Sequence, residues 1–456
     1  MSTHADVAHE TLKLPPGRLG MPFLGETRDW LRNPYDFFEE RTRKFGPVWK
    51  TRILGRNFIC LAGPEAFGFA MDETYFERTG ASPPHVYELP GGDPVILIDG
   101  AKHRRRKQML MPAFDRAALT SYMPTIQEMI ASSVARWDGM GQFDWLPELQ
   151  SLSFSMADAI FTGTEPNPGQ AQLAADLETF SSGLLSAPIR LPWMRFGRAL
   201  AARKRLVRYV TSALDDHRDH PRDTDVMGRL FLSKDENGEG LSEDEFQTEG
   251  LHLYAASAAL LTGALTFLVL GLGEYPDVLR RVREEVSGMP RDEPLTVDGL
   301  LAMPYLRQVS LEVRRFYPLQ ASRFPLRIRQ QVEFMGYDLP AGWNALSCIF
   351  STMHAGAVFD DPEVFDPDRF SRDRHEETRH VHAFATHGGG ERPEDGHRCL
   401  AEGMVEVVLT AFMVLAARDH TWRVLPRDPE LDQTKLVPLP KSGVPVEFTR
   451  AATEPG

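Results

Sequence analysis

Cys399 is the residue of this sequence best placed to carry chemistry, because it follows a glycine-rich loop and precedes an apolar helix. The loop covers residues 387–398 and contains three consecutive glycines at 388–390. Glycines let a backbone lie close to a flat molecule, and the N–H groups at a helix start favour a thiolate by lowering its pKa. We therefore expect Cys399 to bind a metal beneath a planar cofactor.

Two other interpretations of this cysteine stay open at this point. A lone cysteine is most often a buried structural residue. Zinc binding is the second, because histidines are frequent nearby, although one thiol with scattered histidines fits no common structural zinc spacing. These histidines are His375, His380, His382, His387 and His397.

Charged residues upstream of the loop are spaced so that they can form an ion network. Glu312 and Arg315 are three residues apart and share one face of a helix that ends before Tyr317-Pro318. Arg369 follows in the motif Phe-Asp-Pro-Asp-Arg-Phe at 365–370. A carboxylate between two guanidiniums would lock this region together, whereas an isolated pair is usually a solvated salt bridge.

The elements that must position these residues are mostly helical. Apolar periodicity predicts a mainly α protein with small β-sheets at the two ends of the chain, with strands at 48–53, 58–61 and 332–342. No linker divides the sequence, so we expect residues 1–456 to form one domain, with a β-containing lobe at about 15–100 and an α-rich remainder. The predicted helices span 34–46, 101–111, 115–137, 170–185, 198–216, 243–273, 275–288, 305–316 and 400–418.

Composition and charge narrow the range of partners. The net charge of −13, from 51 basic and 64 acidic residues, disfavours nucleic acid or an anionic membrane as the main partner. Three cysteines without paired spacing indicate a reducing compartment, and the polar first 14 residues contain no apolar signal segment, so we expect a cytoplasmic protein. The apolar segment 251–273 is long enough to span a membrane, but its acidic flanks favour a helix buried in a large protein.

Taken in this order, the motifs resemble the cytochrome P450 family. The Glu-x-x-Arg helix, the Phe-x-Pro-x-Arg-Phe motif and the glycine-rich loop into His-x-Cys carry the resemblance. Residues 14–25 and 99–114 look like the family's entry segment and first haem-edge helix, so the resemblance covers most of the chain. It implies the cytochrome P450 fold, haem b as cofactor, and a central helix at 251–273 that crosses the haem.

The resemblance also implies roles for individual residues. Cys399 matches the axial ligand of the haem iron, and Glu312, Arg315 and Arg369 match a structural triad. The family positions that contact the haem propionates correspond in this chain to His103, Lys107, His397 and Arg327. The central helix is expected to supply the substrate pocket with His252, Ala256, Ala259, Leu260 and Gly263.

The central helix departs from the family pattern. Members of the family place an acidic residue and a threonine above the iron to relay protons to dioxygen, whereas Ala259 and Leu260 occupy these positions and cannot carry a proton. Thr262 points to another part of the helix surface, and no Asp or Glu occurs within 250–273. We therefore expect no proton donor on this helix, so hydrogen peroxide or a polar group of the substrate would replace the relay.

A second departure lies in the loop before Cys399, which is longer than the usual family loop and similar to that of the fatty-acid peroxygenase branch. Its extra residues, within 391–396, include the acidic Glu391, Glu394 and Asp395. This acidic insert is expected to repel an acidic ferredoxin. That branch normally presents an Arg-Pro pair on the central helix, where this chain has Ala259-Leu260. This difference weighs against a fatty-acid substrate.

The sequence thus predicts a haem-thiolate oxidoreductase that lacks the acid-alcohol pair and inserts oxygen into, or oxidises, a small, largely apolar organic molecule. Hydrogen peroxide is one candidate oxidant, and a polar group of the substrate that relays protons is the other possibility. Three alternatives remain. The first is a monooxygenase of secondary metabolism that depends on a ferredoxin and its reductase. The second is an isomerase or dehydratase of the allene oxide synthase kind, which needs no reductant. The third is a haem-binding carrier or sensor without turnover.

Overall fold

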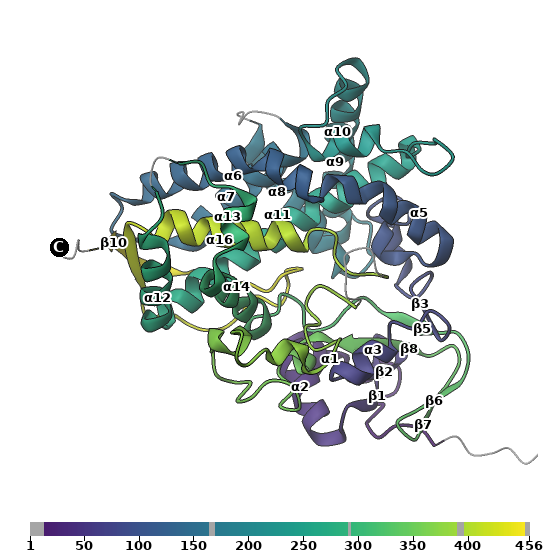
Figure 1. The fold of residues 1–456 in the computed structure, drawn as a ribbon. Coiled ribbons are helices and arrows are strands. Elements are labelled where there is room, and N and C mark those ends of the chain that lie inside the picture. Colours follow the sequence, from purple (N-terminus) through teal and green to yellow (C-terminus); the bar gives the residue numbers. More distant parts are fainter. Residues whose placement is uncertain (1–12, 164–168, 291–292, 390–395, 452–456) are drawn as a thin grey trace, which may run out of the picture.

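Helices dominate the structure and the strands are short, which confirms the predicted fold class (Figure 1). The computed structural model describes residues 13–163, 169–290, 293–389 and 396–451. The α-helices are α1 (Thr27–Arg32), α2 (Pro34–Phe45), α3 (Pro64–Phe69), α4 (Pro84–Glu88), α5 (Gly100–Leu110), α6 (Arg116–Trp137), α7 (Trp145–Thr162), α8 (Gln170–Leu184), α9 (Arg195–Asp219), α10 (Val226–Leu232), α11 (Glu243–Glu274), α12 (Pro276–Ser287), α13 (Val297–Leu301), α14 (Pro304–Phe316), α15 (Ile349–Met353) and α16 (Glu402–Ala417).

The main sheet combines strands from both ends of the chain, whereas separate small sheets at the two ends were expected. Its order is β1-β2-β8-β5-β3, and β8 runs parallel to β2. Figure 1 shows the late strands β5 and β8 beside the early strands β1 and β2. The strands are β1 (Val48–Ile53), β2 (Arg56–Ala62), β3 (Phe76–Glu77), β4 (Gln142–Asp144), β5 (Leu326–Ile328), β6 (Val332–Phe334), β7 (Tyr337–Leu339), β8 (Asn344–Cys348), β9 (His420–Val424) and β10 (Pro445–Arg450).

Apolar periodicity located the long helices with boundaries that are close to the observed ones, but it missed α7. The side chain of Asp144 accepts a hydrogen bond from the N–H of Leu146 (3.0 Å) and caps this helix. An aspartate before an apolar run is a signal for the start of a helix, so this cap could have been predicted from the sequence. The omission matters because α7 packs against α11 and supplies cavity walls.

The central helix α11 is buried, as expected for segment 251–273. It begins with a capping box, in which Ser242 and Glu245 satisfy each other's backbone N–H groups. Within the described part of the chain, α11 is the helix that is long and apolar enough to cross a membrane, and 67% of its most apolar 18-residue window is buried inside the protein. A core helix of a large protein has these same properties.

A network of buried charges joins α14 to the segment that follows β8. The carboxylate of Glu312 lies 2.7 Å from Arg315 Nε and 3.1 Å from Arg369 Nε, so the three predicted residues do meet. The network extends to a residue that the sequence did not reveal, because Arg369 Nη1 lies 2.8 Å from Glu376 Oε2. All four side chains are fully buried, with two positive and two negative charges.

Replacing Glu312 with alanine is expected to lower the free energy of unfolding by about 3–5 kcal/mol, because Arg315 and Arg369 then remain buried without their shared carboxylate. Glu284→Ala is the matched control, since Glu284 pairs with Arg280 on the surface; its cost should stay within about 0.5 kcal/mol. Urea denaturation of both variants measures the difference. Equal costs would show that the buried network does not hold this region.

Candidate functional site

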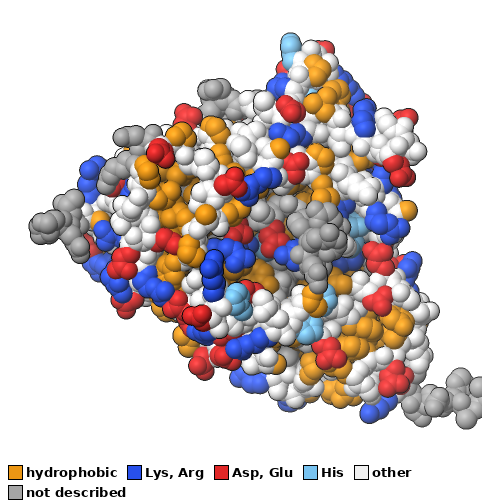
Figure 2. All heavy atoms as spheres, in the orientation of Figure 1, with side chains coloured by type: hydrophobic (Ala, Val, Ile, Leu, Met, Phe, Trp, Pro, Cys, Tyr) orange, Lys and Arg blue, Asp and Glu red, His pale blue; other side chains and the backbone are white. Residues whose placement is uncertain are grey.

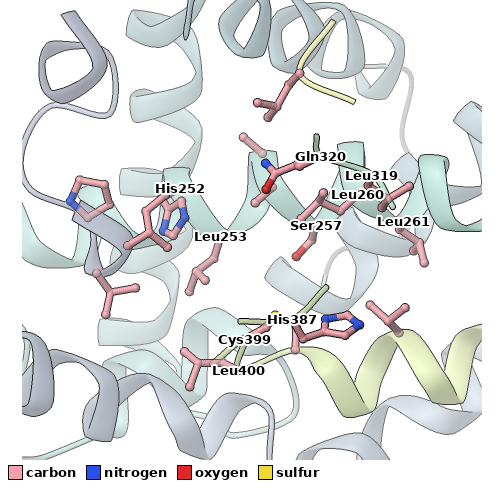
Figure 3. Close-up of a pocket in the computed structure, with 18 of the residues that line it drawn as sticks. His252, Leu253, Ser257, Leu260, Leu261, Leu319, Gln320, His387, Cys399 and Leu400 are labelled. Atoms are coloured by element: carbon pink, nitrogen blue, oxygen red, sulfur yellow. The ribbon is translucent and has the colours of Figure 1, made fainter. Parts of the chain in front are cut away.

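The thiol of Cys399 faces a cavity of about 340 Å³ between α11 and the start of α16 (Figure 3). The backbone N–H of Cys399 donates a hydrogen bond to the carbonyl of His387 (2.7 Å), which fixes the end of the glycine-rich loop. Burial raises the pKa of the Cys399 thiol, although the N–H of Ala401 lowers it. The expected lowering by the helix start is present as the contribution of the Ala401 N–H, but burial outweighs it in the protein alone.

The walls of this cavity are mostly apolar, and its charges have one sign. Among the described residues that line the cavity, none is an aspartate or a glutamate. The cationic lining residues are Arg78, Lys107, Arg314, Arg323 and Arg398. Positive charge on the wall and carboxylates set back from it suit an apolar molecule that carries carboxylates of its own.

Three of the four residues predicted to meet the propionates gather at one edge of the cavity. The rings of His103 and His397 stack at 3.8 Å, and Lys107 donates to the carbonyls of Gly396 (2.5 Å) and Arg398 (3.1 Å). Burial lowers the pKa of His103 to about 4 and that of His397 to about 2. Both imidazoles are therefore neutral near pH 7.

The fourth predicted residue, Arg327, lies outside the cavity, and this prediction is wrong. Arg327 is the middle residue of β5, where Leu326 and Ile328 are buried and Arg327 points outward to Glu77 (Nε–Oε1 2.6 Å). Strand alternation decides this, because neighbouring side chains point to opposite faces.

Arg323 and Arg78 take the place that was expected for Arg327. Arg323 lies just before β5, lines the cavity and donates to the carbonyl of His397 (3.3 Å). Burial lowers the pKa of both guanidiniums, to about 9 for Arg78, whose pKa the nearby Arg323 lowers further. No sequence signal distinguished Arg323 from Arg327, since the strand register was unknown.

The residues around Cys399 fit haem b. Two propionates would supply the carboxylates that the cationic edge lacks. The backbone is also close-packed there, because a Cβ on Gly388 would lie 2.4 Å from Arg323 Nη1 and 2.7 Å from the carbonyl oxygen of His397. The zinc alternative has no support, because the described cluster with metal-binding geometry comprises Glu73, His103 and His397, without the cysteine.

The central helix presents a different face to the cavity from the one predicted. His252, Ala256 and Leu260 line it as expected, but Ala259 and Gly263 do not. Ala259 is rotated by about 100° from Leu260 around the helix. A Cβ on Gly263 would collide with Val437 and Leu319, so this glycine allows close packing rather than forming pocket space. The lining residues of α11 that the sequence reasoning missed are Leu253, Ala255, Ser257, Leu261, Ala264 and Phe267.

His252 is held by a chain of buried charges. Its Nδ1 lies 3.3 Å from Glu249 Oε2, and Glu249 Oε1 accepts hydrogen bonds from Arg106 Nη1 (2.7 Å) and from the N–H of Val95 (2.8 Å). Glu249 thus joins α5, α11 and the wall at residues 95–97. It directly precedes segment 250–273, which contains no acidic residue, and it is buried without lining the cavity.

Two polar side chains of the wall were also missed. Ser257 on α11 and Gln320 in the segment after α14 both project into the cavity (Figure 3). The expectation that no side chain of the central helix could donate a proton is therefore wrong for Ser257. Thr262, in contrast, donates to the carbonyl of Ala258 (2.9 Å) and lies off the cavity wall.

The surface near the cysteine loop carries charges of both signs. Figure 2 shows Lys and Arg side chains among Asp and Glu side chains in the region of α14 and α16. Ion pairs there join Arg307 to Glu406 (3.4 Å) and Arg398 to Glu402 (2.8 Å). The acidic insert with Glu391, Glu394 and Asp395 lies outside the described residues, so its effect on a ferredoxin stays a prediction.

Comparisons with known proteins agree with this site. The family model described as Cytochrome P450 matches residues 15–448. Putative cytochrome P450 120 of Synechocystis sp. (strain ATCC 27184 / PCC 6803 / Kazusa) is 32% identical over 442 residues, which cover 96% of this chain and 97% of the relative. The solved structure of retinoic acid-bound cyanobacterial CYP120A1 matches with a TM-score of 0.88 at 30% identity, covering 97% of this chain and 100% of that one.

Another solved structure, at lower sequence identity, resembles the chain in fold alone. Cytochrome P450EX alpha (CYP152N1), solved with myristic acid, matches with a TM-score of 0.78 at 24% identity, covering 96% of this chain and 99% of that one. The family match extends over nearly the whole chain, and the structure brings Cys399 and the cationic edge to one cavity. The chain belongs to the cytochrome P450 family and is a haem-thiolate oxidoreductase with haem b as its cofactor.

Proposed function

We propose that this protein inserts one oxygen atom from hydrogen peroxide into a largely apolar carboxylic acid. The observation that carries the proposal is the cavity beside Cys399, whose described walls are apolar and cationic and contain no carboxylate. An apolar wall favours an apolar substrate, and the absence of an acid limits proton supply.

Cys399 would ligate the haem iron, and its thiolate would supply electron density that favours O–O cleavage. Arg323, Arg78 and Lys107 would hold the propionates by charge. The neutral rings of His103 and His397 would donate hydrogen bonds to the same groups. These residues position the cofactor, whereas the oxygen chemistry belongs to the haem.

The substrate would lie along α11. Leu253, Leu260 and Leu261 supply an apolar surface, and His252 lies five residues, or about 7.5 Å of helix rise, from Ser257. We assign His252 to the polar end of the substrate, because Glu249 fixes its Nδ1 and leaves Nε2 free to turn toward the cavity. The relative that binds retinoic acid, an apolar carboxylic acid, supports this substrate class.

The choice of oxidant follows from counting protons. Oxygen insertion from dioxygen consumes two electrons and two protons, so it needs a relay to the active site. Hydrogen peroxide already carries both electrons and both protons, and RH + H₂O₂ gives ROH + H₂O without any external supply. A cavity wall with a hydroxyl but no acid suits the second reaction.

Purified, haem-loaded protein is expected to hydroxylate retinoic acid or another apolar acid with hydrogen peroxide alone, as followed by mass spectrometry of the products. The methyl ester of the same acid should react at least several-fold more slowly, because it lacks the anionic end. Turnover that requires a ferredoxin, its reductase and NADPH would contradict peroxide use. Conversion of an organic hydroperoxide without any reductant would instead identify an isomerase or dehydratase. Ligand binding without product, unchanged in Cys399→His, would identify a carrier.

Arg323→Gln is expected to weaken haem binding roughly 10- to 150-fold, because a buried hydrogen bond to a charged group contributes about 1.5–3 kcal/mol. Arg327→Gln is the matched control, since Arg327 is four residues away but is exposed and pairs with Glu77. The rate of haem transfer to apomyoglobin measures the loss. Equal rates of haem transfer for the two variants would show that Arg323 does not bind the cofactor.

A further inference from the structure

Ser257 and Gln320 are two neutral polar side chains in an otherwise apolar part of the cavity wall. They come from different elements, α11 and the segment after α14, and Figure 3 shows both projecting into the space that Cys399 faces. Their neighbours on the wall are Leu260, Leu261 and Leu319. Neither side chain forms a hydrogen bond with any residue that the structure describes.

The lack of a partner for Ser257 is informative because a helical hydroxyl usually has one close by. Thr262, on the same helix, donates to the carbonyl four residues earlier, at 2.9 Å. A hydroxyl and an amide that face an apolar space without partners are each unfavourable by about 1–3 kcal/mol. Both groups therefore call for a polar ligand in the cavity.

The chemistry of the two groups limits what this ligand is. A serine hydroxyl and a glutamine amide can each donate and accept, and neither carries charge. They match a small neutral molecule that also donates and accepts, such as water or hydrogen peroxide. The carboxylates have other places in the cavity, because the propionates would lie at Arg78, Lys107 and Arg323 and the substrate carboxylate at His252.

We propose that Ser257 and Gln320 together hold the water or hydrogen peroxide molecule that faces the iron. They are positioning residues that supply the polar contact which Ala259 and Leu260, at the family's acid and alcohol positions, cannot make. If the bound molecule is hydrogen peroxide, this inference rests on the proposed function. If it is water, the inference rests only on the two polar side chains of the cavity wall.

With peroxide bound, the Ser257 hydroxyl can move a proton without being consumed. It would donate its hydrogen to one peroxide oxygen and accept the hydrogen of the other, so that the first oxygen would leave as water with both hydrogens when the O–O bond breaks. The haem would supply the chemistry by which the remaining oxygen enters a C–H bond of the substrate to form C–O–H. Gln320 keeps the leaving oxygen in place through its amide N–H. Atoms and electrons balance without a further reductant.

The test uses the haem-loaded protein and two measurements on the variants Ser257→Ala and Gln320→Leu. The first is the ferric absorbance spectrum without substrate or peroxide, where loss of a held water should shift the Soret band from the six-coordinate, low-spin form toward the five-coordinate, high-spin form. The second is the KM for hydrogen peroxide, which should rise about five- to tenfold per lost hydrogen bond, with a smaller change in kcat. Ser257→Thr keeps the hydroxyl and should restore both readouts.

Thr262→Val is the matched control, because it removes a hydroxyl from the same helix at a site off the cavity wall, and it should leave both readouts unchanged. Wild-type spectra in both Ser257→Ala and Gln320→Leu would overturn the inference, as would an equal shift in Thr262→Val. If peroxide supports no turnover but the spectra shift as expected, the water site stands and the peroxide proposal fails. The two failures are therefore distinguishable.

Discussion

The buried charge network around Glu312 is the interaction on which the position of the site depends. Its four side chains join α14 to the chain between β8 and the cysteine loop, and none can leave without exposing an uncompensated charge to a dry interior. The same helix also anchors the loop itself. Arg314, next to Arg315, contacts His387 (Nη1–Nε2 3.1 Å), and its carbonyl accepts a hydrogen bond from Thr386 (3.2 Å). One face of α14 therefore secures the network, and the adjoining face secures the approach to Cys399.

In the cavity beside Cys399, the positively charged side chains lie apart from the apolar wall. Cationic side chains collect at the edge near Cys399, while the wall formed by α11 is apolar apart from two polar positions, Ser257 and His252. Because the acidic partners of the nearby cations, such as Glu249 and Glu402, lie behind the wall, a bound molecule meets positive charge without competing carboxylates. This arrangement explains how one cavity can accept both an acidic cofactor edge and an apolar substrate.

The central helix shows how a small sequence change can alter a proton path. Ala259 and Leu260 remove the acid and the alcohol from their usual family positions, yet Ser257 brings a hydroxyl to the cavity from less than one turn away. Small and apolar neighbours leave that hydroxyl unpaired. The chemistry available to the site is therefore set by which helix face turns inward as much as by which residues the helix contains.

The sequence by itself determined the parts of this protein that depend on local spacing and residue type. Helix periodicity located α11 and α14, the three-residue spacing placed Glu312 beside Arg315, and the glycine-rich loop before an apolar helix singled out Cys399. The tertiary structure decided what depends on contacts between distant segments. Strand pairing of β5 with β3 and β8 turned Arg327 outward and left Arg323 in the cavity. The packing of α11 selected Ser257 over Ala259, and folding brought Glu376 to Arg369. These outcomes follow from the register of the strands and the rotation of the helices. Both are set by segments far away in the chain, so the local sequence pattern cannot predict them.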